Sequence, residues 1–96
     1  MIVRIVRMTF KPENTEAFLD IFRSSKEKIR AFEGCNHVEL LQDVKNPNVY
    51  STYSLWVSEE HLNKYRDSHL FGQVWPATKA LFAEKPQAWS HVPVKI

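Results

Sequence analysis

The stretch WVSEEHLNKYRDSHLFGQVWPATKALF, residues 56–82, holds most of the side chains that could bind or alter a small molecule. Its rings that could stack on a flat aromatic ligand belong to Trp56, Tyr65, Phe71 and Trp75. His69 is a candidate general base, because an unperturbed imidazole titrates near neutral pH. The tyrosine hydroxyl could hydrogen-bond a substrate oxygen. The segment therefore predicts an aromatic pocket with a candidate proton acceptor.

Each of these residues also has a structural interpretation. Trp56 could be a core indole whose N–H finds a carbonyl, and Phe71 and Trp75 stand at the helical spacing of core or pocket-wall residues. His61 and His69 could share one face of a continuous helix, but they lack a third close ligand. No metal site is predicted.

Two candidates lie outside this segment. Arg7 stands among apolar residues of a predicted strand, where a guanidinium needs a carboxylate, an aromatic face or an anionic ligand. Glu39 or Asp43 could supply that carboxylate, so Arg7 is either paired or catalytic. His37 and His91 lie on other predicted strands, where they could point into the pocket or across a dimer.

The helices and strands that position these residues are predicted from the periodicity of apolar residues and from the residues that interrupt it. Strands are predicted at residues 2–10, 37–43, 49–57 and 87–94, and helices at 15–32 and 59–83. Asn14 or Thr15 can cap the first helix, and Gly34 can end it. Gly72 and Pro76 predict that the second helical region divides into two or three pieces with bends.

The order βαββαβ predicts an α+β, ferredoxin-like domain over residues 1–96, with a four-stranded antiparallel sheet and both helices on one face. In the strand 49–57, one face carries Trp56 and Tyr50, and the other carries Tyr53 and Leu55. Because neither face is fully polar, we expect a homodimer that pairs sheet against sheet.

Composition excludes several functional classes. The 96 residues carry 13 basic and 11 acidic side chains without a basic run, which argues against binding to nucleic acid. No apolar run is long enough for a membrane span or a signal-peptide core, and Cys35 is the only cysteine, so we expect a cytoplasmic protein. Catalytic carboxylate pairs, a nucleophile elbow, a phosphate loop and a flavin fingerprint are also missing. No cofactor is predicted.

The chain resembles the antibiotic biosynthesis monooxygenase superfamily of dimeric α+β barrels. The resemblance covers almost the whole sequence and rests on FEGCNHVEL after the first helix, LWVSEEHLNKYRDSHLF, and the final strand after EKPQAW. It implies either a cofactor-independent monooxygenase acting on a quinol or polyketide-like aromatic, with Trp56 at a recurring tryptophan position, or a non-catalytic dimeric ligand-binding or stress-related protein.

The haem-degrading branch of that superfamily is not expected here. An ungapped match from Trp56 aligns Phe71 with a shared phenylalanine but puts Trp75 where that branch carries its iron-binding histidine. Residues 2–10 also lack the asparagine that the branch uses in its first strand.

Overall fold

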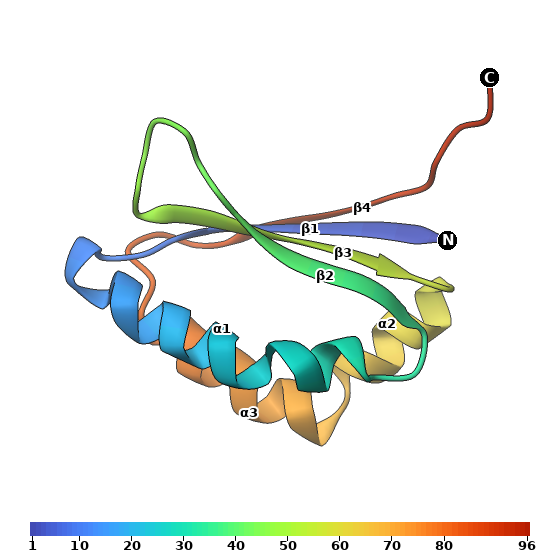
Figure 1. Ribbon diagram of the computed structural model, residues 1–96, viewed down its shortest axis with the longest axis horizontal. Coiled ribbons are helices and arrows are strands. Elements are labelled where there is room, and N and C mark those ends of the chain that lie inside the picture. Colours follow the sequence, from blue (N-terminus) through green and yellow to red (C-terminus); the bar gives the residue numbers. More distant parts are fainter.

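The computed structural model describes residues 1–96 and has the predicted order of elements. The strands are β1 (Ile2–Thr9), β2 (Cys35–Gln42), β3 (Val49–Trp56) and β4 (Gln87–His91), and the helices are α1 (Thr15–Arg30), α2 (Glu59–Arg66) and α3 (His69–Lys79), with a 3₁₀ turn at Pro12–Asn14. The sheet is antiparallel in the order β2-β3-β1-β4. All three α-helices lie on one face of it (Figure 1). The α+β, ferredoxin-like prediction is confirmed.

Several predicted boundaries shift. The helix α1 ends at Arg30 rather than at residue 32, and the side chain of Asn14 makes no capping hydrogen bond because the 3₁₀ turn precedes the helix. The strand β2 starts earlier than expected, at Cys35, with a register irregularity between Cys35 and His37. The strand β4 ends at His91, before Pro93, which has no N–H to donate to a ladder.

The second helical region divides once, between Arg66 and His69, where Ser68 caps the new helix. Its hydroxyl accepts a hydrogen bond from the Phe71 N–H at 3.1 Å and donates one to the Tyr65 carbonyl at 2.6 Å. The helix α3 then continues through Gly72 and Pro76, so the bends expected at those two residues do not interrupt it. The helical region divides at Ser68 because that residue caps a new helix. Pro76 does not end α3, because it removes only one N–H from the helix.

Gly34 joins α1 to β2 in the left-handed region, with φ of +88°. A Cβ at this position would overlap the imidazole of His61 in α2. The missing side chain therefore lets the turn after α1 pack directly under the first turn of α2.

The core occupies the space between the sheet and the helices. Its most enclosed cluster is Met8, Phe10, Phe18 and Tyr50. The rings of Phe10 and Phe18 stack with centroids 4.1 Å apart. No α-helix in the fold is both long and apolar enough to cross a lipid bilayer.

Candidate functional site

A cavity of about 310 Å³ lies between the helix-facing side of the sheet and the helices. Fourteen of its 21 lining residues are hydrophobic, so most of the wall offers no hydrogen bond. Its volume is at the lower end of those that hold small molecules. The cavity can accept a small, flat, largely apolar ligand.

Four aromatic residues of the predicted pocket form one continuous wall of this cavity. They are Trp56, Tyr65, Phe71 and Trp75. Trp56 stacks on Tyr65 at 5.0 Å, Tyr65 meets Phe71 edge-on at 5.2 Å, and Phe71 stacks on Trp75 at 5.7 Å. The end of β3 supplies the first ring and the helices α2 and α3 supply the others. The tertiary structure therefore brings together the four aromatic residues that the sequence nominated.

Trp56 is buried, and its indole N–H is hydrogen-bonded within the protein. Its side chain is almost fully buried, at 1% relative exposure, and its Nε1–H donates to the Ser54 Oγ at 3.0 Å. The partner is a hydroxyl two residues away on the same face of β3, not the carbonyl that the structural interpretation anticipated. Because the N–H is already engaged, the indole presents ring surface rather than a free donor to the cavity.

Tyr65 brings an unengaged hydroxyl to the aromatic wall. Burial, with a smaller contribution from Cys35, raises the pKa of its phenol to about 12. Its hydroxyl forms no hydrogen bond with another residue. At neutral pH this hydroxyl is protonated and can donate to a ligand oxygen.

The two charged side chains that line the cavity are both arginines, Arg4 from β1 and Arg66 from α2. The Nη1 atom of Arg4 donates to the Ser90 Oγ at 3.0 Å, and neither guanidinium forms a salt bridge. Burial, and secondarily the charge of Arg66, lower the pKa of Arg4. The cavity therefore contains positive charge and no acidic side chain.

Neither arginine is among the site residues predicted from the sequence. In β1 the alternation of side chains places Arg4 on the same face as Val6 and Met8, which was the available signal. Arg66 follows Tyr65 in the last turn of α2, where a cation is ordinary because it complements the helix dipole. A local pattern could not separate this arginine from a solvated one.

Four nominated polar residues, Arg7, His37, His69 and His91, do not line this cavity. Arg7 projects from the opposite face of β1 and pairs with Asp43 at 3.5 Å, one of the two partners anticipated for it. His37 also lies outside the cavity, and its Nε2 is 3.1 Å from an oxygen of Glu39.

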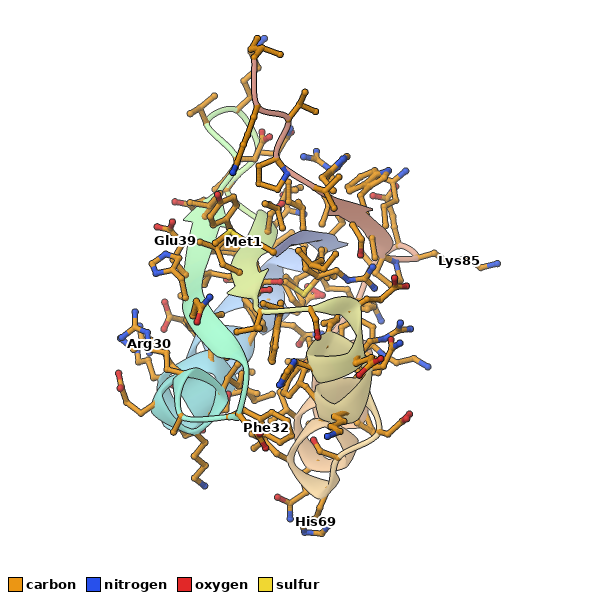
Figure 2. The ribbon with its side chains drawn as sticks, turned by 90° about the vertical axis from the view of Figure 1, so that its right-hand side faces the viewer. Met1, Arg30, Phe32, Glu39, His69 and Lys85 are labelled. Carbon is orange, nitrogen blue, oxygen red and sulfur yellow. The ribbon has the colours of Figure 1, made fainter.

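His69 is exposed at the start of α3, at the end of the helical layer farthest from the sheet in Figure 2. The cavity lining includes no histidine and no carboxylate, so it offers no conventional general base. His69 is therefore not the proton acceptor expected for this site: it is exposed at the start of α3, whereas Phe71, two residues later in the same turn, lines the cavity. Nor does any cluster of three or more histidine, cysteine or acidic residues form a candidate metal site.

Known proteins resemble this chain in sequence and in fold. A family model described as antibiotic biosynthesis monooxygenase matches residues 1–76. A crystal structure of an antibiotic biosynthesis monooxygenase superposes with a TM-score of 0.93 at 22% identity, covering 99% of this chain and 100% of the other. A conserved protein from Methanosarcina mazei Go1 superposes with a TM-score of 0.89 at 22% identity, covering 95% and 91%.

Rv0793 from Mycobacterium tuberculosis gives a TM-score of 0.90 at 16% identity, with 99% of this chain and 96% of the other covered. At these identities the structural likeness establishes the fold. No functionally curated protein matches the sequence.

Proposed function

Because the chain belongs to the antibiotic biosynthesis monooxygenase family, we propose that it is a cofactor-independent monooxygenase that oxidises a small phenolic aromatic with molecular oxygen. The observation that carries this proposal is the apolar cavity walled by four aromatic rings. Such a wall can hold a flat substrate by stacking and can exclude water from the reacting atoms.

The proposed reaction needs no external reductant, because the substrate supplies all the electrons. An ionised hydroquinone passes one electron to oxygen, and the resulting radical pair forms a carbon–oxygen bond. Loss of water from that peroxide leaves a hydroxyquinone, so one oxygen atom enters the product and the other leaves as water. An anthrone reacts with the same stoichiometry: its methylene group becomes a carbonyl, and one water molecule is released.

Ionisation of the substrate is the step that the protein must assist. No carboxylate or imidazole lines the cavity, so we assign this role to electrostatics rather than to a general base. The guanidinium groups of Arg4 and Arg66 favour the phenolate over the phenol, and the Tyr65 hydroxyl can donate to the developing oxyanion. The proton then leaves to solvent.

A non-catalytic ligand-binding protein of the same fold is the second candidate. The absence of a histidine or carboxylate from the lining favours it, because a binding protein needs no proton acceptor. The same aromatic wall would then hold a ligand without oxidising it.

We also propose that the protein is a homodimer joined through the sheet faces. The helices cover only one face (Figure 1). The other carries Val3, Ile5, Tyr53, Leu55 and Trp89 at facing register positions. Trp89 is 42% exposed in the single chain, and a second copy would cover this apolar surface.

The oxygenase proposal is tested by oxygen uptake with metal-stripped protein and a panel of hydroquinones and anthrones. We expect uptake above spontaneous oxidation that falls about tenfold in Tyr65→Phe, which removes one donor from the cavity. Tyr53→Phe is the matched control, because it removes a hydroxyl from the opposite face of the sheet. Binding of the panel compounds without uptake would favour the non-catalytic alternative.

A further inference from the structure

The cavity contains two guanidinium groups and no group that could neutralise them. Arg4 and Arg66 line it, and neither forms a salt bridge. The three other arginines of the chain, Arg7, Arg23 and Arg30, each form a salt bridge with an acidic side chain. Arg4 and Arg66 are therefore the two arginines of the chain that have no acidic partner.

The position of Arg4 is costly without an anion, and the nearby charge of Arg66 adds to that cost. Arg4 is half-buried in β1, one of the two inner strands of the sheet, and Arg66 is exposed in the last turn of α2. Removing a guanidinium from water costs free energy that only a charged or hydrogen-bonding partner offsets. The Ser90 hydroxyl supplies one neutral acceptor to Arg4. Burial, and secondarily the charge of Arg66, lower the pKa of Arg4.

We infer that the substrate of this site is a hydroxyaromatic carboxylate, whose carboxylate binds between Arg4 and Arg66 while its ring lies against the aromatic wall. This inference rests on the proposed function and narrows its substrate class. A simple phenolate would neutralise only one of the two cations. A ring that carries both a carboxylate and an ionised hydroxyl matches both, because its two negative charges equal the two positive charges of the lining.

The remainder of the cavity limits the size of the ligand and the kind of ring. Apart from the two arginines, the polar part of the lining consists of uncharged side chains, such as the hydroxyls of Thr52 and Thr78. The volume of about 310 Å³ is small for an organic ligand site. A carboxylate has the planar geometry that guanidinium groups bind with paired hydrogen bonds, which favours it over a larger anionic group.

Salicylate and its neutral amide, salicylamide, test the inference directly, because both keep the ring and the hydroxyl. We expect isothermal titration calorimetry to give about tenfold tighter binding of salicylate at neutral pH and low salt. Added salt should weaken salicylate binding and leave salicylamide binding unchanged.

Arg4→Met and Arg66→Met should each remove most of this preference for the carboxylate. Lys64→Met is the matched control, because it removes one exposed positive charge from the same helix and lies outside the cavity lining. Arg66 is exposed, so its variant will fold even if the half-buried Arg4 variant is destabilised. A thermal unfolding curve checks both.

Equal binding of the two compounds, or binding of neither, would overturn the inference. So would a salicylate preference that survives Arg66→Met and falls equally in Lys64→Met. Failure of the oxygenase proposal is a separate result. Oxygen uptake with neutral hydroquinones and no salicylate preference would leave only the oxygenase standing, whereas arginine-dependent salicylate binding without uptake would leave only the anion specificity.

Discussion

At the scale of single residues, Trp56 and Tyr65 form a stacked pair that lines the cavity, and Trp56 also belongs to the buried core. Trp56 is buried and satisfied by Ser54, whereas Tyr65 keeps a protonated hydroxyl without a protein partner. The first residue therefore fixes the wall and the second gives it a polar group. Their substitutions should accordingly affect different properties.

Replacing Trp56 should chiefly lower the free energy of unfolding. Trp56→Ala should cost roughly 3–5 kcal/mol through the space it leaves, and Trp56→Phe about 1–2 kcal/mol because the Ser54 hydroxyl loses its donor. Urea unfolding measures both. In the double variant Trp56→Phe, Ser54→Ala, the two losses should be less than additive, since both remove one hydrogen bond. Strict additivity would show that this bond contributes nothing.

Tyr65 should make stability depend on alkaline pH. Its folded pKa is raised to about 12 from the ordinary value of 10, so its contribution is fully present below pH 10 and is lost as the pH rises through 10 towards 12. Tyr65→Phe should therefore lose less stability than the wild-type protein over this interval. Urea unfolding at a series of alkaline pH values makes the comparison. Parallel curves for the two proteins would contradict the raised pKa.

At the scale of elements, the site depends on where α2 and α3 begin. Ser58 caps α2 by accepting a hydrogen bond from the His61 N–H at 3.2 Å, and Ser68 caps α3 in the same manner. The break between the helices places Tyr65 at the end of one and Phe71 at the start of the next, so their rings meet edge-on. The turn at Gly34 packs against α2, because Gly34 lies close to the side chain of His61.

The two glycines of the chain should respond in opposite directions to alanine. Gly34→Ala should lower the free energy of unfolding by at least about 1–2 kcal/mol, because its φ is positive and its Cβ would overlap His61. Gly72→Ala should raise it by about 0.5–1 kcal/mol, because Gly72 lies inside α3 with open space around it. Denaturant unfolding of the pair measures both. Stabilisation by Gly34→Ala would refute the close packing of α2 on this turn.

At the scale of the whole molecule, one layer of helices covers a sheet that is apolar on both sides. The cavity uses the covered face, and the proposed dimer uses the other. Arg7 and His37 lie on that second face, so they bear on assembly rather than on the cavity of their own chain. The C-terminal residues after β4 leave the body of the domain on this same side of the sheet (Figure 1).

A charge placed in the uncovered face should break the dimer. Leu55→Lys puts an ammonium on this surface, where a second copy would have to desolvate it, so the dimer should weaken by about tenfold or more. Sedimentation equilibrium measures the effect, with Ala17→Lys on the exposed side of α1 as the control. A wild-type protein that stays monomeric at high concentration would refute the proposed assembly.

The sequence by itself determined the order of the elements, the antiparallel ferredoxin-like plan and the aromatic character of the site. These follow from local signals: the alternation in the strands, the caps at Ser58 and Ser68, and the helical spacing of the aromatic residues. They need no knowledge of which segments meet in space.

Only the tertiary structure decided which cation lies in the cavity. Arg4 and Arg7 are three residues apart in one strand, and both stand among apolar neighbours, so alternation assigns them to opposite faces without saying which face the helices cover. Packing of the helices places the half-buried Arg4 in the cavity lining with Arg66, whereas Arg7 pairs with Asp43 on the other face. Because both faces of β1 are apolar, hydrophobic pattern alone could not make that choice, and the contacts with the helices make it.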